Sequence, residues 1–566
     1  METGTGTVTY KSQDKGYGFI ETNKNERCFF HTNEIGCQNF QQLTLKKYVT
    51  FEYINSTQGI KVMSILDISN SPKVVNRHNK AINFSEEQIR ELFGVLAAED
   101  ENIDRFNSYF IKTDTYEKIH NFLPIRILVA HKGIGKSAIF RMSYIENQNN
   151  NVLSLWVKPN DIANLGKTEG PIDSLELIRQ WQSGLESIII EKIISNFNLD
   201  NENELFKQVT NKGIRLADRI SSIVKKIPEL INVDTVKKQV AEQYKKNKKI
   251  IIFIDDLDRA WDGSTQNISR ISALLNAVRD MCSESQELCF RISLRSDVYF
   301  LVRTADESTD KIDGNIIWLK WTEHELLALL VKRIQSFFLV EISEKKLLTM
   351  NQSEMSSYLD DIMESNFKGA GKWNERPIRY ILLSLIRKRP RDLVNLCTLA
   401  ARNANANSRN LIVTDDWEDI FEQYSLSRLQ DTINEHRYEL PEIERLLLGM
   451  KPSHNAKKEE KPYVYSKKKL FSKVNGIMQN EKFFFSNEKV ASTEDLISFM
   501  YKINFIVARK DLANGFIDRK YFEDNKYITS SYVDFGYDWE IHPAFRWALY
   551  PEAKNVLLGT DFPEFN

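Results

Sequence analysis

The sequence lacks several features that would indicate particular classes of protein. Its 77 lysines and arginines nearly cancel its 78 aspartates and glutamates, and the formal net charge of −1 gives no overall basic field that would favour nucleic acid. Its five cysteines fall in no CxxC or Cys/His spacing, which excludes a recognisable zinc site. With no signal peptide ahead of them, they predict reduced thiols in a cytoplasmic protein.

Long apolar runs and the common hydrolase motifs are also missing. The longest apolar runs, such as KIIIFID and ELLALLVKRI, are far shorter than the roughly 20 residues of a membrane span, so no membrane partner is expected. There is no HExxH, no nucleophile elbow and no paired carboxylate–lysine nuclease motif. Any chemistry must therefore come from another kind of motif.

Changes in hydrophobic pattern divide the 566 residues into several parts, since the chain is too long for one core. Short β-like runs separated by turns predict a small all-β barrel at the start. Buried-strand runs that alternate with amphipathic helices then predict an α/β fold with a mainly parallel sheet. The expected parts are a barrel at 1–68, a linker and helix at 69–104, an α/β core at 105–314, a helical region at 315–410 and an α+β domain at 411–566.

A strand, a glycine-containing loop and a helix are predicted in IRILVAHKGIGKSAIFRM. Such a loop lays backbone N–H groups around phosphate oxygens at the positive end of the helix. Lys136 would bridge the terminal phosphates of ATP, and the Ser137 hydroxyl would coordinate Mg²⁺. The pattern GxxxxGK[ST] fails only at Ala130, where a small residue suffices; the alternative is a chance GKS on a surface turn. The expected cofactor-binding residues here are Ala130, His131, Lys132, Gly133, Ile134, Gly135, Lys136, Ser137 and Ala138.

A second motif, KKIIIFIDDLDRAWDG, is a buried strand that ends in acids. In α/β folds, ligands bind at the carboxyl ends of the strands. Asp255 would hold the magnesium ion, directly or through water, and Asp256 would polarise the attacking water. The alternative is that these acids only cap a helix. The order of the two motifs within one α/β region favours a site for Mg-ATP.

Residues 105 to about 410 resemble bacterial P-loop ATPases of the STAND and KAP type. The motifs that carry the resemblance are HKGIGKSA, IIIFIDDLDR, FRISLRSDVY, WTEHELLALLVKRI and RPRDLVNL, in that order. The resemblance implies ATP binding and hydrolysis coupled to conformational change, often with self-association into an oligomer. Many members are implicated in bacterial defence against phage. Ala130 in place of glycine, and the lack of the transmembrane helices common in KAP members, leave the subfamily open.

The same resemblance implies roles for three arginines. Arg295, in LRSD, lies in the region of the γ-phosphate sensor and is a predicted catalytic residue. Arg391, in RPRD, lies in the helical lid, where such ATPases place a second sensor, and is predicted to bind the nucleotide. Arg259, directly after DDLD, is a candidate for a charge supplied to the nucleotide of a neighbouring subunit. An ion-pair role is the alternative for each.

The first 31 residues place aromatic side chains at alternate positions of successive strands. If these strands pair, their rings form a strip on one sheet face, on which bases can stack at about 1–3 kcal/mol each. The alternative, that the strip is core, is opposed by Ile20, Cys28 and Phe30, which occupy the opposite phase and can fill the interior. The predicted nucleic-acid contacts are Tyr10, Lys15, Tyr17, Phe19, Phe29 and His31.

Residues 4–68 resemble the bacterial cold-shock domain through KGYGFI, FFH and VTFEY. That family is a five-stranded OB-fold barrel that binds single-stranded nucleic acid. The usual Lys-Trp-Phe-Asn run is here Thr9-Tyr10-Lys11-Ser12, so one aromatic is lost. Acids in this segment balance its bases, which predicts modest affinity and weak salt dependence. The competing reading is a barrel that docks a protein partner.

The end of the chain, with STEDLISFMYKINFIVARK and DWEIHPAFRWAL, resembles the winged-helix domain found on many STAND-type proteins. Such a domain can hold the ATPase closed, bind DNA or contact a partner. The lysines between 457 and 473 are either a basic patch or, more commonly, a solvated linker. His542 and Trp547 are expected to pack between the wing and a helix.

Together these motifs lead to the hypothesis of an ATP-dependent switch that senses single-stranded RNA or DNA. Because no effector chemistry is visible, a separate effector protein is expected, and the role in anti-phage defence follows from the resemblance alone. One alternative is an ATP-binding oligomeric scaffold with little turnover, its barrel docking a protein partner. Another is an ATP-driven motor on nucleic acid.

Overall fold

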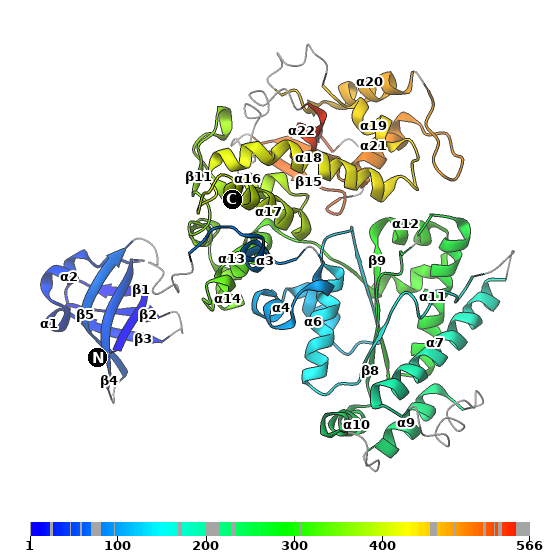
Figure 1. The fold of residues 1–566 in the computed structure, drawn as a ribbon, viewed down its shortest axis with the longest axis horizontal. Helices are drawn as coiled ribbons and strands as arrows, with labels where there is room; N and C mark the ends of the chain where they lie inside the picture. Colours follow the sequence, from blue (N-terminus) through cyan, green and yellow to red (C-terminus); the bar gives the residue numbers. More distant parts are fainter. Residues whose placement is uncertain are drawn as a thin grey trace. The chain divides into compact units, whose positions relative to one another are not determined.

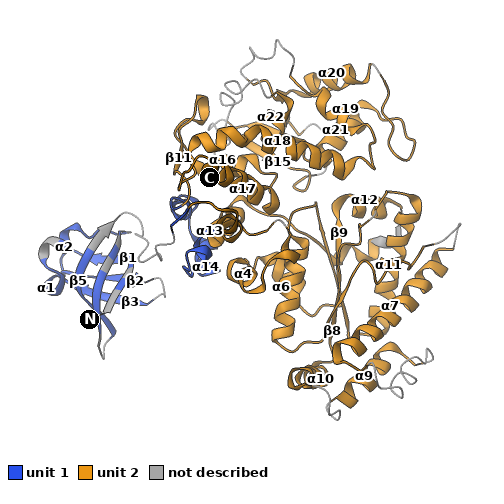
Figure 2. Cartoon of the chain, viewed as in Figure 1, with its two compact units in different colours: residues 1–82, 334–361 blue, residues 83–333, 362–566 orange. Residues whose placement is uncertain are grey.

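A computed structural model describes residues 2–22, 26–45, 47–56, 59–69, 81–95, 97–167, 173–199, 214–227, 234–259, 261–305, 307–452, 461–479, 481–512, 517–525, 527–529 and 535–550. Two compact units make up the chain (Figure 2). Unit 1 holds residues 1–82 and 334–361, and unit 2 holds residues 83–333 and 362–566. Among the described residues, no helix is both long and apolar enough to cross a membrane.

The N-terminal part of unit 1 is a closed five-stranded barrel in the order β1-β2-β3-β5-β4. Only β3 and β5 pair in parallel. Alternation with a period of two sends one face of each strand inward, where Ile20, Cys28 and Phe30 are fully buried. The predicted all-β barrel is thus confirmed. Its elements are β1 (Glu2–Ser12), β2 (Tyr17–Thr22), β3 (Arg27–His31), α1 (Thr32–Ile35), α2 (Cys37–Gln42), β4 (Tyr48–Ser56) and β5 (Gly59–Ser69).

Unit 2 is built on a parallel five-stranded sheet in the order β10-β6-β9-β8-β7. Figure 1 labels two of its neighbouring strands, β8 and β9. Every residue of β8 is buried, as expected for a strand covered on both faces. Because β9 lies between β6 and β8, the carboxyl ends of these three strands are adjacent. The strands are β6 (Ile125–Ala130), β7 (Ser154–Val157), β8 (Ile250–Ile254), β9 (Leu288–Arg295) and β10 (Ile316–Trp318).

Helices cover this sheet, and the predicted central α/β domain is therefore confirmed. A large apolar core joins the strands to long helices on the sheet faces, among them α7 and α11. The helices that follow β6 in the sequence are α6 (Lys136–Asn149), α7 (Ser174–Phe197), α9 (Leu216–Lys226), α10 (Thr235–Asn247), α11 (Thr265–Glu284), α12 (Ser296–Ala305) and η3 (Glu307–Asn315). Before that strand come α3 (Glu86–Phe93), η1 (Ala98–Asp100), α4 (Ile103–Tyr109) and α5 (Asp114–His120).

The region after the sheet is mainly helical, as predicted. Its helices are α13 (Glu323–Phe337), α14 (Glu344–Thr349), α15 (Gln352–Ser356), η4 (Ser357–Leu359), η5 (Gly371–Trp373), α16 (Ile378–Leu385), α17 (Pro390–Ala406) and α18 (Thr414–His436), with the short strands β11 (Asn366–Phe367) and β12 (Arg376–Pro377). Pro390 at the first position of α17 pre-sets the helical backbone and gives up an N–H that would have no intrahelical partner. Helices α17 and α18 pack against each other.

The C-terminal part mixes helices with an antiparallel sheet in the order β13-β16-β14-β15. Trp547 packs on Phe421 of α18 with ring centroids 4.8 Å apart, and buried His542 lies 3.1 Å from the Tyr521 hydroxyl, so both side chains pack in the interior. Whether this domain is a winged helix stays a prediction. Its elements are α19 (Ile443–Gly449), β13 (Val464–Tyr465), α20 (Lys467–Met478), α21 (Thr493–Lys502), β14 (Ile506–Asp511), β15 (Ile517–Lys520), β16 (Asp538–Ile541), η7 (Pro543–Phe545) and α22 (Arg546–Leu549).

Several predicted parts fall partly outside the described residues. Of the expected linker and helix at 69–104, residues 70–80 and 96 lie outside them, and of the lysine-rich stretch at 457–473, residues 457–460 do.

Candidate functional site

The glycine loop has the predicted strand–loop–helix geometry. Strand β6 ends at Ala130 and α6 begins at Lys136. Gly133 and Gly135 have φ values of 80° and 106°, a left-handed conformation that glycine adopts without the steric cost of a side chain. Gly135 is the N-cap of α6, so the loop leads straight into the positive end of the helix.

The Lys136 ammonium lies over its own loop. Its Nζ donates to the carbonyl oxygens of Ala130 at 3.1 Å and His131 at 3.4 Å. Burial lowers the pKa of Lys136 from its ordinary value, while Asp258 and Asp255 oppose that shift. The charged ammonium is therefore held against the loop by carbonyl oxygens and by carboxylates across the cavity.

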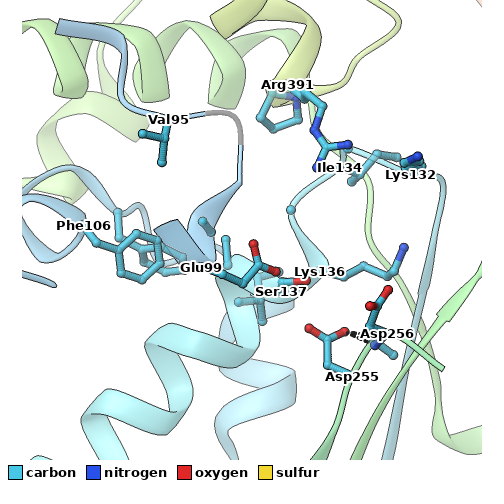
Figure 3. Close-up of a pocket in the computed structure, with 18 of the residues that line it drawn as sticks. Val95, Glu99, Phe106, Lys132, Ile134, Lys136, Ser137, Asp255, Asp256 and Arg391 are labelled. Carbon is cyan, nitrogen blue, oxygen red and sulfur yellow. Dashed lines mark hydrogen bonds between the residues drawn. The ribbon is translucent and has the colours of Figure 1, made fainter. Parts of the chain in front are cut away.

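A cavity of about 550 Å³ lies beside this loop (Figure 3). One part of its wall is polar, and the other is apolar, with Val95, Phe106, Tyr109 and Val394. The sequence-predicted residues that line it are Lys132, Gly133, Ile134, Gly135, Lys136, Ser137, Ala138, Asp255, Asp256, Arg259, Arg295 and Arg391. Ala130 and His131 do not line it, and both are buried behind the loop, each 3% exposed.

The acids after β8 face the loop across this cavity. Buried Asp255 accepts hydrogen bonds from the Ser293 hydroxyl of β9 and, at 2.9 Å, from the N–H of Asp256. Burial raises the pKa of Asp256, and the nearby Asp258 and Asp255 raise it further. Asp256 also has a φ of 58°, a conformation that is uncommon for a residue with a side chain.

Asp255 and Ser137 line the same cavity, and their carboxylate and hydroxyl oxygens are donors of the kind that Mg²⁺ prefers. Burial raises the pKa of Asp256 and of Asp258, and the neighbouring Asp258 and Asp255 carboxylates raise the pKa of Asp256 further by repulsion. A divalent cation would relieve that repulsion. The residues present therefore fit magnesium.

Arg295 lines the cavity but is already paired. Its guanidinium forms two hydrogen bonds with Asp297, the shorter at 2.7 Å, and donates to the Glu435 carbonyl oxygen at 3.1 Å. Burial would lower the pKa of Arg295, but the Asp297 and Glu435 carboxylates outweigh it and hold the pKa above its usual range. The ion-pair alternative left open for this residue is thus present in the structure.

The other two arginines contact the loop and the acids through their backbones. The N–H of Arg391, in the first turn of α17, donates to the Gly133 carbonyl at 3.3 Å. Its side chain lies over Gly133, where an added Cβ would come within 3.2 Å of it. The N–H of Arg259 donates to the Asp256 carbonyl at 3.2 Å, and its side chain is exposed at the cavity.

The sequence reasoning missed an acid from far along the chain. An oxygen of Glu435, near the end of α18, accepts a hydrogen bond from the N–H of Lys132 at 3.3 Å. Arg389 joins the two, because its Nη1 lies 3.2 Å from both the Lys132 carbonyl and the other Glu435 oxygen. No local pattern marks Glu435, although Arg389 stands two positions before the arginine that RPRD singled out.

The sequence reasoning also missed the contacts of His131 and two acids of the site, Glu99 and Asp258. The Nε2 atom of His131 contacts a carboxylate oxygen of Glu523, and its Nδ1 atom forms a 3.0 Å hydrogen bond with the Ser296 hydroxyl. Glu99 of η1 lines the cavity above Ser137 (Figure 3). Asp258 stands in the DDLD motif itself, and its position three residues after Asp255 was the available signal.

The aromatic strip on the barrel has the predicted form. Cross-strand pairing sets Tyr10 opposite Phe19 and Phe19 opposite Phe29. The Phe19 and Phe29 ring centroids lie 5.7 Å apart, and Phe29 stacks on His31 at 6.4 Å. Tyr10 is 42% exposed, whereas the opposite face forms the core. The strip can therefore present rings to solvent without emptying the barrel interior.

Two basic residues of the barrel have roles that the sequence did not show. Arg27 lies over the Phe19 ring, with its guanidinium carbon 3.9 Å from the centroid. Lys11 turns away to donate to the carbonyls of Phe40 and Leu43, so its charge is used inside the domain. Lys15 is exposed in the turn between β1 and β2.

Three family models match the chain: the 'cold-shock' DNA-binding domain over residues 4–66, the KAP family P-loop domain over residues 68–283, and the FunZ-associated C-terminal helical domain over residues 324–433. Two cold shock-like proteins are similar to the N-terminal domain. That of Aquifex aeolicus is 34% identical over 61 residues, 11% of this chain and 87% of that protein. That of Shewanella violacea is 30% identical over 66 residues, which are 12% of this chain and 94% of that protein.

A longer relative is the putative transposon gamma-delta 80.3 kDa protein of Escherichia coli K12. It is 23% identical over 385 residues, which are 62% of this chain and 52% of that protein, so the chain spans about half of its length. Among solved structures, the Aeropyrum pernix ORC2 protein in ADPNP-ADP complexes gives a TM-score of 0.37 at 10% identity, over 81% of this chain and 98% of that one. The structure of Drosophila ORC bound to DNA gives a TM-score of 0.28 at 10% identity, and the match covers 85% of this chain and 94% of that one.

The motifs, the loop geometry and the matches to the family models agree. Through residues 4–66 the chain belongs to the cold-shock family, and it joins that nucleic-acid-binding type of domain to a KAP family P-loop NTPase domain and a C-terminal helical domain.

Proposed function

We propose that this chain is an ATP-dependent molecular switch in which single-stranded nucleic acid on the cold-shock domain changes the binding and hydrolysis of Mg-ATP. The observation that carries the proposal is the cavity in which the glycine loop, Lys136 and Ser137 meet the acids that follow β8. A loop of this form ahead of a helix binds phosphate, and acids at the carboxyl end of a neighbouring strand hold its cation.

Each polar group in the cavity has a role in this proposal. The loop N–H groups and Lys136 bind the phosphates, while Ser137 and Asp255 hold Mg²⁺, which neutralises charge on the phosphates when bound. Asp256 accepts a proton from the attacking water, and its raised pKa makes it a stronger base than an ordinary aspartate. The apolar wall, with Phe106 and Val394, suits a purine ring.

On the barrel, the aromatic strip supplies the nucleic-acid surface. Bases stack on Tyr17, Phe19 and Phe29, and Arg27 and Lys15 lie where a phosphate backbone would pass. Because the barrel has no large excess of basic residues, stacking contributes most of the affinity, and RNA and DNA are both suitable ligands.

The test is the ATPase rate of the full chain with and without single-stranded RNA or DNA. The double variant Phe19→Ala/Phe29→Ala removes two stacking rings, and Leu45→Ala, an exposed apolar residue between α2 and β4, is the matched control. We expect nucleic acid to change the rate in the wild type and the control but not in the double variant. A rate that ignores nucleic acid in all three chains contradicts the switch.

A second candidate, an ATP-binding oligomeric scaffold with little turnover, is favoured by the pairing of Arg295 with Asp297. In that pairing the arginine is not free to stabilise charge on the γ-phosphate. Asp256→Asn separates the two proposals. A scaffold keeps its ATP-dependent assembly in this variant, whereas a switch that needs hydrolysis loses its function. In an oligomer, exposed Arg259 would reach the nucleotide of a neighbouring subunit.

The resemblance to STAND and KAP ATPases supports two further proposals and is their only support. The first is a role in defence against phage through a separate effector protein, and the second is a winged-helix domain that transmits the nucleotide state. Plaque counts on cells that carry the wild-type chain or Lys136→Ala test the first. Equal counts with and without the wild-type chain would rule it out.

A further inference from the structure

A second cavity, of about 410 Å³, lies between the glycine loop, the start of α17 and the last turns of α18. Its wall is rich in arginine. Five basic side chains face three carboxylates, which leaves two positive charges in excess. The basic residues are Lys132, Arg387, Arg389, Arg391 and Arg428, and the acids are Asp392, Asp431 and Glu435.

Two of these arginines share one of the three acids, and Arg389 pairs with Glu435 at 3.2 Å. Asp392 is shared, because Arg387 binds it through two hydrogen bonds at 2.8 and 3.0 Å and Arg428 binds it at 2.6 Å. Asp431, on the rim, pairs with Arg428 at 2.9 Å but is 53% exposed. One fully buried carboxylate thus serves two guanidinium groups.

Two donors in this wall have no acceptor among the described residues. They are the Nε atoms of Arg389 and Arg428, whose side chains are 3% and 4% exposed. A buried N–H group that lacks a partner is costly, and native structures rarely leave one without an acceptor. The ammonium of Lys132, which is exposed at the mouth, forms no ion pair with a described residue. Because both Nε atoms are themselves buried, the features that favour an anion are the net positive charge of the wall and the exposed Lys132 ammonium.

We propose that this cavity binds the phosphate monoester group of a small molecule. A phosphate monoester carries about −1.5 to −2 charges near pH 7 and presents several strong acceptor oxygens, which matches two excess positive charges. Arginine is the side chain best shaped to bind phosphate through two parallel hydrogen bonds. The volume lies within the ~300–1,000 Å³ range of small-molecule sites, which admits a ligand up to the size of a mononucleotide.

The site is distinct from the nucleotide cavity but touches it. Lys132 and Arg391 line both cavities, and Figure 3 shows them at the nucleotide cavity. Arg389 bonds to the glycine loop through the Lys132 carbonyl. A dianion in the second cavity draws these cations toward itself. Because coupling between two ligands is reciprocal, the monoester then changes the affinity for nucleotide, and nucleotide changes the affinity for the monoester by the same factor.

Titration calorimetry of the full chain with glycerol 3-phosphate tests the proposal. Lys136→Ala disables the glycine loop and should leave this binding within twofold of the wild type. Asn395→Asp/Ser427→Asp adds two negative charges to the cavity wall and should weaken it at least tenfold. Gln423→Glu, an acid added on an exposed position of α18 outside the cavity, should have no effect.

Asp431→Asn removes a negative charge from the rim of the cavity and should strengthen the binding of glycerol 3-phosphate a few-fold. Adding and removing negative charge should therefore change the affinity in opposite directions. Thermal melts of each variant separate loss of folding from loss of binding. Failure of glycerol 3-phosphate to bind to the wild type overturns the proposal. Binding that is lost in Lys136→Ala but unchanged in the double variant also overturns it, because the ester then occupies the nucleotide cavity.

Discussion

The carboxylate of Glu435, at the end of α18, accepts a hydrogen bond from the backbone N–H of Lys132 in the glycine loop at 3.3 Å. That N–H belongs to a loop whose N–H groups are the expected ligands of phosphate oxygens. A carboxylate in this place competes with phosphate for the donor and repels its charge. The C-terminal half of the chain thus contacts the glycine loop directly.

The first prediction concerns this contact. Glu435→Gln keeps the side-chain size and removes the negative charge beside the loop, so we expect the full chain to bind a non-hydrolysable Mg-ATP analogue about three- to tenfold more tightly, a change near 1 kcal/mol. Calorimetric titration measures it. Glu439→Gln is the control, because Glu439 pairs with Lys502 at 2.7 Å instead of with the loop. Equal affinity in both variants and the wild type would show that Glu435 exerts no such effect.

Much of the candidate site could be predicted from local sequence. The strand, loop and helix around GIGKS, and the acids after KIIIFID, are contiguous motifs whose geometry follows from backbone pairing and glycine conformation. The strip of Phe19 and Phe29 follows from the period of two. These features need only short stretches of chain, and each was visible in the sequence.

Contacts between distant segments could not be predicted in this way. Glu435 is about 300 residues from Lys132, and its position depends on how α18 packs against α17. The sequence also left open whether Arg295 faces a phosphate or pairs with an acid. The LRSD motif contains both Arg295 and its partner Asp297, but only the fold shows that they pair. Burial and pairing, which only the fold supplies, decided that arginine's environment.

A second prediction follows from the raised pKa of Asp256. A carboxyl whose pKa is raised in the folded protein destabilises the fold when it is ionised. This loss of folding stability is complete above the folded-state pKa and disappears below the pKa of an ordinary aspartate. Asp256→Asn removes the charge, and asparagine tolerates the φ of 58°. We therefore expect a higher melting temperature at pH 7.5, with a gain that shrinks as the pH falls toward 4.

Calorimetric melts across this pH range measure the effect. Asp262→Asn is the comparison, because the pKa of Asp262 is lowered by its hydrogen bonds to Ser264 and Asn267 in spite of partial burial. Because the ionised form of Asp262 stabilises the fold, Asp262→Asn should lower the melting temperature at neutral pH. A drop in the melting temperature of Asp256→Asn at pH 7.5 would contradict the account.

A third prediction separates nucleotide binding from turnover. Lys136→Ala removes the ammonium that faces the phosphates, so Mg-ATP binding should weaken at least tenfold. Asp256→Asn keeps the loop intact and should bind within about threefold of the wild type, while losing roughly 100-fold in the rate of phosphate release, the usual size of a general-base contribution. Equal losses of binding in the two variants would mean that Asp256 acts on nucleotide affinity and not on the chemical step.

The last prediction concerns Arg27, whose guanidinium lies 3.9 Å from the Phe19 ring centroid. In this place it can contact one phosphate next to a stacked base, so Arg27→Ala should weaken binding of single-stranded nucleic acid and make the slope of log K against log salt less negative by about 0.7. Lys61→Ala is the matched control, because Lys61 is paired with Glu34 at 2.8 Å and should leave the slope almost unchanged. Fluorescence anisotropy with a labelled oligonucleotide at several salt concentrations gives both slopes. An unchanged slope with weaker binding would assign Arg27 to ring packing and not to the phosphate, because packing does not depend on salt.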